Sequence, residues 1–371
     1  MASPKAIAAI GRCLSNPLDT AAIGEKSFAG VIGDAPSQYS KSPQLWNAAF
    51  RHLQINSVYV PFDVAAADLG NLLAAFKDSQ SFLGANVTVP HKVRAMDFLD
   101  EIDPGAGRIQ AVNTIARTAD GKLVGYNTDG EGFVQSILQP TPDRTDSLLP
   151  SFNGMNVLLL GAGGSARAVA FHVADLLADG RLFICNRTPE PARSLAAEIQ
   201  KVARNATAIA QGDLPTWAPK AGLIVNSTTK GQGGIRRLAN GMATLMESYS
   251  ALAPADPPAL AEADAGKSDF ERQWSGAAGA DIEANNQASM QLAQSIPPHV
   301  RFYDLIYHPE ETVFLRHGRL TGHPTMNGKS MIINQALIAF CKRICNAALQ
   351  ARGIDTPDTY KQILEVMYQA W

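Results

Sequence analysis

The sequence predicts an α/β protein of two domains, and three observations lead to this prediction. Its 371 residues are 46% hydrophobic and 18% charged, which is enough chain for two cores. Residues 157–160 are an unbroken apolar run, V-L-L-L, as in a strand of a parallel sheet that helices cover on both faces. A glycine-rich turn and an Ala-rich helical stretch then lead to a second apolar strand at 181–185. This order indicates a parallel sheet in the second half of the chain.

The turn after the first of these strands has the pattern G-x-G-x-x-A, which is typical of dinucleotide-binding domains. Gly161 permits a tight turn, Gly163 lets a pyrophosphate approach the backbone, and Ala166 lets the helix pack on the strand. The amides at the helix start would face an anion. The pattern alone is weak, since glycines also end strands for structural reasons, but the flanking strands strengthen it. We therefore predict cofactor contacts from Gly161, Ala162, Gly163, Gly164, Ser165 and Ala166.

The end of the strand at 181–185 indicates which dinucleotide binds. Asn186, Arg187 and Thr188 stand where an NAD-binding unit carries an Asp or Glu for the ribose 2′-hydroxyl. A neutral side chain followed by a cation favours a 2′-phosphate, because an arginine binds phosphate oxygens that a carboxylate would repel. We therefore predict NADP as the cofactor, with NAD as the alternative if Arg187 is merely solvated at the strand end.

The overall composition argues against several classes of protein. A formal net charge of -2 gives no reason to expect a nucleic acid or a membrane as a partner. The four cysteines fit neither a disulfide framework nor the usual zinc spacings, so we expect free thiols and no metal. Residues 1–16 lack the apolar core of a signal peptide, and no other stretch is long enough to span a membrane. We therefore expect a cytoplasmic protein.

The first half of the chain begins with a strand and a polar loop. Residues 28–33 form a short apolar strand, and Pro43 opens a helix that carries Trp46 and Phe50. Ser42 is a natural N-cap for this helix. Ser40 and Ser42 also present two hydroxyls that can bind a carboxylate, with simple capping as the alternative for either serine alone.

An alternating strand follows further on. Residues 58–64 predict a strand and residues 65–77 a helix, and the run from Gly84 to Val89 then alternates, so that Asn86 and Thr88 share one face. Pro90 suits the first position of a helix, which places Lys92 in the first turn, where the helix dipole disfavours a cation. A lysine at this position either extends its side chain into solvent or has a chemical role. The polar pair at the same edge favours a chemical role.

Two further apolar segments, at 111–115 and 124–126, end in polar groups. The first contains Asn113, and the second leads into the run N-T-D-G at 127–130. Asp129 is a candidate for the chemistry, with an Asx turn or a helix cap as the alternative. Residues 139–153 contain three prolines and predict a hinge between the domains.

The remainder of the chain contains a long irregular stretch. Residues 223–226 and 300–307 predict strands, and residues 232–298 between them are rich in Ala, Gly and Asp. We expect this stretch to be a surface insertion, an inert loop rather than a lid, with marginal helices at 242–252 and 284–293. Residues 331–349 predict a helix with one apolar face and a polar interruption at Gln335. The first domain is expected at 1–138, with 315–371 returning to it, and the second at 151–314.

These segments together make the chain resemble the shikimate/quinate dehydrogenase family. The shared runs are S-K-S-P at 40–43, N-V-T-V-P-H-K at 86–92, A-V-N-T at 111–114, N-T-D-G at 127–130, G-A-G-G at 161–164, N-R-T at 186–188 and N-S-T at 226–228. The set is completed by Asp304, Tyr307, Pro309, Thr312, Gly328, Met331 and Gln335. The resemblance implies an N-terminal α/β substrate domain, a Rossmann-like domain for NADP, and a C-terminal helix that returns to the first domain.

The resemblance also implies a role for each matching residue. Lys92 and Asp129 match the catalytic pair, and Ser40 and Ser42 match the serines that bind the substrate carboxylate. Contacts with the rest of the substrate are expected from Asn86, Thr88, Asn113, Tyr307 and Gln335. Contacts with the cofactor are expected from Asn186, Arg187, Thr188, Asn226, Ser227, Thr228, Gly328 and Met331, in addition to the glycine turn.

The implied reaction is the reversible NADP-dependent oxidation of shikimate to 3-dehydroshikimate. A ring alcohol loses its hydroxyl proton as hydride leaves, so the site needs a proton acceptor and a stabiliser for the developing oxyanion. We expect Lys92 to exchange the proton and Asp129 to orient Lys92. We expect the protein to be a monomer or a homodimer. Quinate oxidation with NAD is the close alternative, and a non-catalytic regulator that binds shikimate or quinate is a more distant one.

Three departures from the family pattern bear on these expectations. The loop from Gly33 to Ser40 is one residue longer than the common form. The run P-E-P at 189–191 stands where many NADP-using members carry a second cation, so half of the phosphate clamp is missing and Glu190 adds a negative charge. The insertion after Gly231 replaces a short connection and removes a methionine that is often found there.

Overall fold

The computed structural model describes residues 4–238, 240–261 and 267–371. It divides the chain into two compact units. Unit 1 comprises Met1–Ser136, Pro140–Asp146 and Met331–Trp371, and unit 2 comprises Ile137–Gln139 and Ser147–Ser330. Residues 239 and 262–266 of the predicted insertion, and residues 1–3 of the N-terminal stretch, lie outside the described residues.

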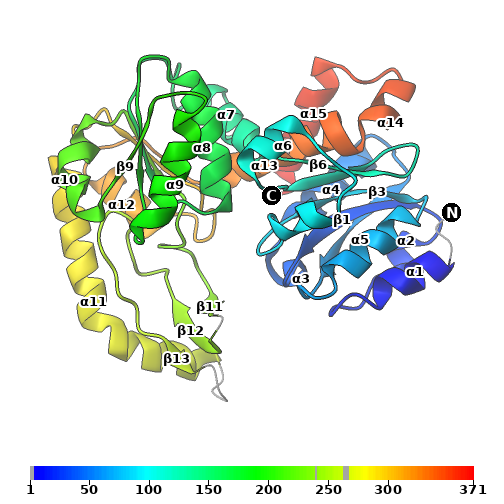
Figure 1. Ribbon diagram of the computed structural model, residues 1–371, viewed down its shortest axis with the longest axis horizontal. Coiled ribbons are helices and arrows are strands. Elements are labelled where there is room, and N and C mark those ends of the chain that lie inside the picture. Colours follow the sequence, from blue (N-terminus) through cyan, green and yellow to red (C-terminus); the bar gives the residue numbers. More distant parts are fainter. Residues whose placement is uncertain (1–3, 239, 262–266) are drawn as a thin grey trace. The chain divides into compact units, whose positions relative to one another are not determined.

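Unit 1 contains a mixed six-stranded sheet with helices on both faces (Figure 1). The strand order is β2-β1-β3-β5-β6-β4, with β1 parallel to β2 and β3, and β5 antiparallel to β3 and β6. The predicted strands at 28–33, 58–64 and 84–89 are confirmed, although β3 ends earlier than expected. The strands are β1 (Ser27–Gly33), β2 (Ser57–Asp63), β3 (Phe82–Val87), β4 (Glu101–Ile102), β5 (Thr114–Arg117) and β6 (Leu123–Tyr126).

Each face of this sheet has its own core. On one face, α1 (Pro4–Gly11) and α5 (Leu69–Lys77) cover a cluster in which Phe76 stacks on Phe82 with ring centroids 4.0 Å apart. On the other face, Trp46 of α4 (Ser42–His52) packs against Phe340, just after α13 (Lys329–Ala339). The shorter elements are α2 (Thr20–Ile23), α3 (Pro36–Tyr39), the 3-10 helix η1 (Arg94–Phe98), α6 (Pro104–Ile109), α7 (Asp129–Leu138), the π-helix η4 (Phe340–Ile344) and α14 (Asn346–Ala351).

The C-terminal segment therefore returns to the first unit, as predicted. It also adds a helix that the sequence analysis did not anticipate, α15 (Pro357–Gln369), whose Ile363 and Met367 join the same core as Trp46. The predicted start of the return at 315 is wrong. Phe314 stacks on Phe302 with ring centroids 4.9 Å apart, and this packing keeps α12 (Val313–Leu320) in unit 2.

Unit 2 contains a six-stranded parallel sheet of order β9-β8-β7-β10-β14-β15. Numbered within this unit, the order is 3-2-1-4-5-6, which is the arrangement of a Rossmann fold. Its strands are β7 (Val157–Leu160), β8 (Leu182–Cys185), β9 (Ala206–Ile209), β10 (Leu223–Asn226), β14 (Arg301–Asp304) and β15 (Thr325–Met326). Because the direction of winding reverses between β7 and β10, a ligand site is expected where these two strands end.

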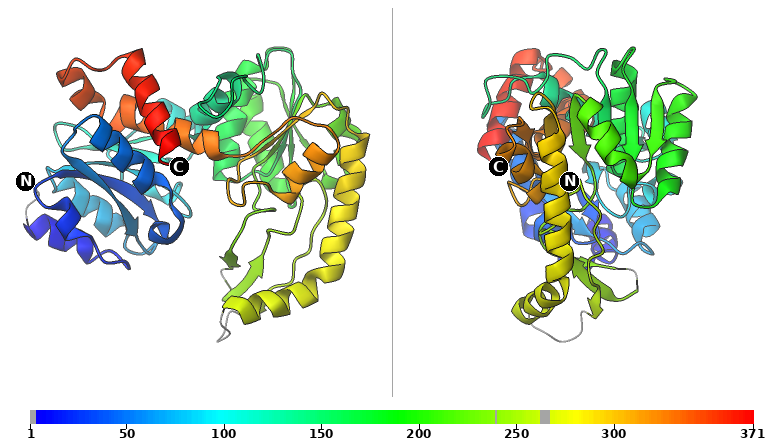
Figure 2. Two further views of the ribbon diagram at one scale, coloured as in Figure 1. Left: turned by 180° about the vertical axis from the view of Figure 1, so that it is seen from behind. Right: turned by 90° about the vertical axis from the view of Figure 1, so that its left-hand side faces the viewer.

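Helices cover both faces of the unit 2 sheet (Figure 2). One face carries α8 (Gly164–Leu176) and α9 (Pro189–Gln200), and the other carries α12 and the end of α11 (Lys267–Ser295). Three short helices lie between β9 and β10, namely η2 (Gln211–Asp213), α10 (Leu214–Trp217) and η3 (Ala218–Lys220).

The predicted insertion at 232–298 is only partly a surface loop. It forms a small antiparallel sheet of β11 (Ile235–Arg237), β12 (Met242–Leu245) and β13 (Leu260–Ala261), followed by α11. The predicted helix at 242–252 is wrong, because residues 242–245 pair with both neighbouring strands as β12. The helix at 284–293 is confirmed as part of α11, whose Leu292 and Ala293 join the main core of unit 2.

Two expectations about the whole chain can be compared with the structure. The four cysteines are free thiols, as predicted, and three of them are buried. Within the described residues, no helix combines the length and the apolar character needed to cross a membrane.

Candidate functional site

An ion pair joins Lys92 and Asp129 in unit 1. Lys92 Nζ lies 2.5 Å from Asp129 Oδ2, and the two side chains are only 16% and 6% exposed. Asp129 is the first residue of α7, where the helix dipole favours a negative charge. The carboxylate therefore lies beside two sources of positive potential, the Lys92 ammonium group and the start of α7, while Lys92 retains some contact with solvent.

The helix that was predicted to begin at Pro90 is absent. Residues 89–93 form turns, and the following helix is the short η1. The reason is that residues far away in the sequence hold this segment by hydrogen bonds. Val112 N donates to Lys92 O at 2.8 Å, and the buried His91 ring bonds to Val64 O at 2.9 Å. Tertiary hydrogen bonds, and not a helix terminus, therefore position Lys92.

Asn113 connects the ion pair to the rest of a buried polar network. Its amide nitrogen donates to Asp129 Oδ1 at 2.7 Å and to Gln335 Oε1 at 3.2 Å. Its carbonyl oxygen accepts from Thr114 Oγ1 at 2.9 Å and from Thr128 N at 2.8 Å. Since one amide contacts both the carboxylate and the glutamine, the structure brings together the predicted residues Lys92, Asp129, Asn113 and Gln335.

Asn86 extends this network along β3. Its Nδ2 donates to Thr114 Oγ1 at 3.1 Å, and its Oδ1 accepts from Tyr59 OH at 2.8 Å. Tyr59 OH also bonds to the Ser42 hydroxyl, and burial raises the pKa of this phenol well above its usual range. The predicted residues Asn86 and Ser42 are therefore linked through Tyr59, which the sequence analysis missed.

The two serines lie at the start of α4. Ser42, which was expected to be the N-cap, is instead the first residue of the helix, and the N-cap is Lys41. Ser40 Oγ accepts from Ser42 N at 3.2 Å. Ser42 is nearly buried and Ser40 is more exposed. Thr88 directly follows β3. Its methyl group lies against Gly33, because a Cβ added to Gly33 would lie 2.5 Å from Thr88 Cγ2.

Tyr59, Thr114 and Thr128 were not predicted as site residues. Thr114 and Thr128 stand beside Asn113 and Asp129 in the two quoted sequence runs, which is a local signal that could have found them. Tyr59 has no such signal, because it lies in an ordinary apolar strand. Only the pairing of β2 with β1, and of β1 with β3, brings it beside Asn86.

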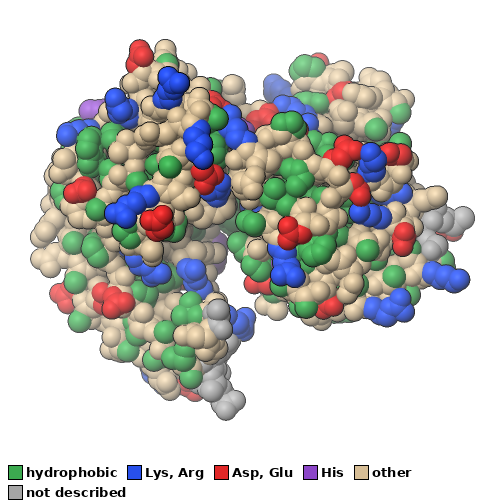
Figure 3. Space-filling view, viewed as in Figure 1, with side chains coloured by type: hydrophobic (Ala, Val, Ile, Leu, Met, Phe, Trp, Pro, Cys, Tyr) green, Lys and Arg blue, Asp and Glu red, His purple; other side chains and the backbone are tan. Residues whose placement is uncertain are grey.

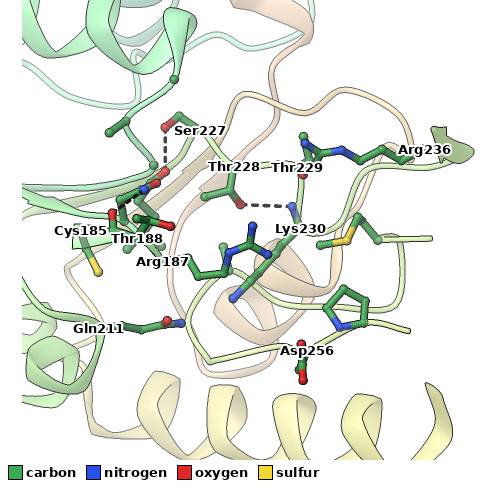
Figure 4. Close-up of a pocket in the computed structure, with 18 of the residues that line it drawn as sticks. Cys185, Arg187, Thr188, Gln211, Ser227, Thr228, Thr229, Lys230, Arg236 and Asp256 are labelled. Carbon is green, nitrogen blue, oxygen red and sulfur yellow. Dashed lines mark hydrogen bonds between the residues drawn. The ribbon is translucent and has the colours of Figure 1, made fainter. Parts of the chain in front are cut away.

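Unit 2 has a cavity of about 410 Å³ where β7, β8 and β10 end (Figure 4). Gly161 has a φ of +112°, and a Cβ there would approach Ser227 Oγ to 2.5 Å, so the turn requires glycine. A Cβ at Gly163 would meet nothing within 4 Å, which leaves open space at the start of α8 for a phosphate group. The tight turn predicted at Gly161 is present, and the approach of a pyrophosphate at Gly163 stays a prediction.

Most of the predicted cofactor residues line this cavity. They are Gly161, Ala162, Gly163, Asn186, Arg187, Thr188, Ser227 and Thr228. Among the lining residues are also Lys230 and Arg236, two cations that the sequence analysis did not select. Lys230 lies in the polar turn at the end of β10, and Arg236 follows that turn. A search for cations beyond the N-R-T run would have found both.

Asn226 lies outside the cavity lining, and its side chain has a structural use. It is fully buried, and its amide donates to Asp304 Oδ1 at 3.0 Å and to Lys230 O at 3.0 Å. Asp304 in turn accepts from Thr312 Oγ1 at 2.7 Å, and burial raises its pKa to about 7. Asn226 therefore fixes the turn that carries Ser227, Thr228 and Lys230.

The remaining predicted cofactor and substrate residues also lie outside the cavity lining. Ser165 and Ala166 continue α8 after Gly164, and Met331 is buried in α13. A Cβ at Gly328 would approach Leu305 O to 2.0 Å, so this glycine permits close backbone packing within unit 2. Tyr307 follows β14 in unit 2, and burial raises the pKa of its hydroxyl.

Comparison with known families gives two matches. A model described as the shikimate dehydrogenase substrate binding domain matches residues 31–115, and one described as shikimate / quinate 5-dehydrogenase matches residues 144–244. These two ranges fall in unit 1 and largely in unit 2, respectively.

Individual proteins are similar over most of the chain. The shikimate dehydrogenase (NADP(+)) of Carboxydothermus hydrogenoformans is 34% identical over 319 residues, which are 86% of this chain and 92% of that protein. That of one strain of Methanococcus maripaludis is 31% identical over 313 residues, 84% of this chain and 90% of that protein.

Solved structures give the same result. A shikimate dehydrogenase in complex with NADP+ has a TM-score of 0.64 at 28% identity, covering 94% of this chain and 95% of that one. The shikimate 5-dehydrogenase of Thermus thermophilus, in complex with NADP(H) and shikimate, has a TM-score of 0.62 at 26% identity, covering 93% and 99%. The chain therefore belongs to the shikimate/quinate dehydrogenase family of oxidoreductases.

Proposed function

We propose that this protein catalyses the reversible oxidation of shikimate to 3-dehydroshikimate with NADP as the cofactor. The observation that carries this proposal is the Lys92–Asp129 pair, with Asn113 donating to the second carboxylate oxygen. Both oxygens of Asp129 are thus occupied by donors that fix its orientation. A lysine held in this way presents its remaining N–H groups, or its lone pair when it is neutral, to a substrate hydroxyl.

The residues of unit 1 would handle the proton and the alcohol oxygen. In the direction of oxidation, the hydroxyl proton passes to Lys92 Nζ as the C–H bond breaks and the C–O bond becomes a carbonyl. Bound NADP+ supplies the acceptor for the hydride. In the reverse direction, Lys92 returns the proton to the oxygen. Asp129 stabilises the ammonium form and keeps Lys92 in place.

The network around the ion pair would recognise the other substrate groups. The hydroxyl groups of Ser40 and Ser42 would donate hydrogen bonds to the carboxylate. The ring hydroxyls would be bound by the amide and hydroxyl groups of Asn86, Thr88, Asn113 and Gln335. Tyr59 OH donates to Asn86 Oδ1 at 2.8 Å, and Thr128 Oγ1 donates to Gln335 Oε1 at 3.3 Å, so that these side-chain amides are held in defined orientations. Such preorganisation is what orientation-dependent catalysis requires.

The cavity of unit 2 fits NADP. Gly161 and Gly163 provide the turn for the pyrophosphate, and Arg187 follows β8, where a cation favours a 2′-phosphate. We propose roles in cofactor binding for the other predicted residues that line the cavity. Asn226 acts by positioning the turn after β10.

The test is a set of steady-state assays that follow reduced nicotinamide, with shikimate or quinate and with NADP+ or NAD+. We expect the highest kcat/KM for shikimate with NADP+. A preference for quinate with NAD+ would replace the proposal with its closest alternative. Binding of shikimate without turnover in any of the four combinations would indicate a regulator.

Two further properties remain predictions. We propose that the protein acts in the cytoplasm and that it is a monomer or a homodimer. Cell fractionation and light scattering coupled to size-exclusion chromatography test them. A membrane-associated fraction or a larger assembly would contradict them.

A further inference from the structure

Three cations line the cavity of unit 2, and two of them lie outside the N-R-T run. Arg187 follows β8, whereas Lys230 lies in the turn after β10 and Arg236 lies on β11. Figure 4 shows the side chains of Arg187 and Lys230 next to each other, with Arg236 beside Thr229. In the part of the chain that the structure describes, none of the three forms an ion pair with a carboxylate.

Lys230 is held rigidly in this cavity. It is only 9% exposed, its backbone N donates to Thr228 Oγ1 at 3.1 Å, and its ammonium group donates to Ala253 O. Burial and the charge of Arg187 lower its pKa to about 8. Arg187 and Lys230 face a cavity whose described lining carries one carboxylate, that of the exposed Asp256. The repulsion between two neighbouring cations is unfavourable, and an anion that enters the cavity relieves it.

Arg236 is positioned by the inserted segment. It pairs with Thr244 in the β11–β12 hairpin, and its guanidinium donates to Thr229 Oγ1. The hairpin is anchored because the buried Trp274 of α11 donates from Nε1 to Thr244 Oγ1 at 3.1 Å. Figure 3 shows Lys and Arg side chains on this face of unit 2, between the large sheet and the hairpin. The insertion therefore builds one wall of the nucleotide cavity.

Glu190, which adds a negative charge after the N-R-T run, lies outside the cavity lining. Its carboxylate lies 3.9 Å from Arg193, both side chains are largely exposed, and neither residue lines the cavity. The carboxylate that does line the cavity, among its described residues, is the exposed Asp256. The N-R-T end of the cavity is thus cationic in spite of the P-E-P run.

We propose that Lys230 and Arg236 bind the 2′-phosphate of NADP together with Arg187, in place of the second cation that the chain lacks after its N-R-T run. The inference rests on the proposed use of NADP. A phosphate dianion accepts several hydrogen bonds at once, and charge-assisted donors are the strongest. The specificity for NADP over NAD would then come largely from the turn after β10 and from the inserted hairpin.

The test measures binding and not turnover. Dissociation constants for NADP+ and NAD+ are determined by calorimetry for the wild type, Lys230→Met, Arg236→Gln and the control Arg237→Gln. Arg237 is the next residue on β11 but does not line the cavity. Each of the two site variants should bind NADP+ roughly 10- to 100-fold more weakly. Binding of NAD+ should change by less than about twofold, as should both affinities of the control.

Each outcome decides the inference. Equal weakening for both cofactors, or unchanged binding of NADP+, would overturn it. The variant Lys230→Arg guards against a folding defect, because it keeps the charge and should retain most of the preference for NADP+. If the wild type binds NADP+ through these residues but does not oxidise shikimate, the proposed reaction fails and this inference stands. If it oxidises shikimate with NADP+ and the variants keep full preference, the inference fails alone.

Discussion

Asn113 Nδ2 donates to Gln335 Oε1 at 3.2 Å across 222 positions of the chain. The contact depends on a close approach of α7 to α13, since a Cβ at Gly132 would lie 2.7 Å from Gln335 N. The polar network of unit 1 is therefore completed by a helix that enters the unit only after the whole of unit 2 has been traversed. Gln335 accepts from the Asn113 amide that also donates to Asp129, so the distant segment influences the ion pair through Asn113.

The first prediction concerns the ion pair itself. Lys92→Met should lower kcat for shikimate oxidation by at least about 100-fold, because it removes the proton acceptor and leaves Asp129 without its cation. The control is Lys77→Met, which breaks the exposed Lys77–Asp100 pair of the same unit, where the atoms are 2.8 Å apart. That control should stay within about twofold of wild type. Turnover of Lys92→Met near the wild-type rate, with shikimate still bound, would refute the role of Lys92.

The second prediction concerns Tyr59, which the sequence analysis missed. Tyr59→Phe keeps the stacking on Trp46, with centroids 4.8 Å apart, but removes the hydrogen bond to Asn86 Oδ1. Loss of a donor to a buried acceptor should cost about 1–3 kcal/mol of unfolding free energy. We also expect a higher KM for shikimate with a smaller change in kcat. Tyr39→Phe at the exposed surface is the matched control, and equal kinetics for the two variants would remove Tyr59 from the site.

The third prediction is a pH dependence of cofactor binding. Lys230 has a pKa of about 8, lowered by burial and by Arg187, with Cys185 and Asp281 acting in the opposite direction. It is protonated below this value and loses its charge above it. Affinity for NADP+ should therefore fall roughly tenfold between pH 7 and pH 9, while affinity for NAD+ stays nearly constant. The pKa of the Cys185 thiol is about 11, so it stays uncharged over this range.

A variant separates Lys230 from other titrating groups. Lys230→Arg remains charged throughout, so its affinity for NADP+ should not follow the same curve. Fluorescence titration of NADPH against NADH across this range provides the measurement. Parallel curves for wild type and Lys230→Arg would show that another group is responsible.

The fourth prediction concerns the stability of unit 2. Burial raises the pKa of Asp304 to about 7 from its usual value of 3.8. Between these values the folded protein holds a proton that the unfolded chain has released, so stability falls as pH rises and levels off above about 7. Relative to Asp304→Asn, which cannot titrate, the unfolding free energy of the wild type should drop by about 2–3 kcal/mol between pH 5 and pH 7.

Urea denaturation followed by circular dichroism at several pH values measures this difference. If both proteins show the same dependence on pH, Asp304 is ionised throughout, held by its hydrogen bonds to Asn226, Thr312 and Ile306.

Local patterns predicted the elements that carry their own signals. The alternation around Asn86 and the glycines at 161 and 163 led to the correct strands and to the correct turn. Tyr59 was invisible because its role depends on strand pairing, and the helix at Pro90 was wrong because hydrogen bonds from Val112 and to Val64 override local preference. The inserted hairpin was missed because its segment is rich in Ala, Gly and Asp and its strands are short. These strands are held by Trp274 of α11, which donates to Thr244, thirty residues earlier in the chain.

The return of the C-terminal segment to unit 1 has a consequence for synthesis on the ribosome. Nearly all of unit 2 is one continuous stretch, Ser147–Ser330, whereas the core of Trp46 is completed by Phe340 and Met367. Domains fold as units once their residues are available. We therefore expect unit 2 to reach its native state before residues 331–371 have been translated. During that interval the apolar face of unit 1 that these residues cover is still exposed.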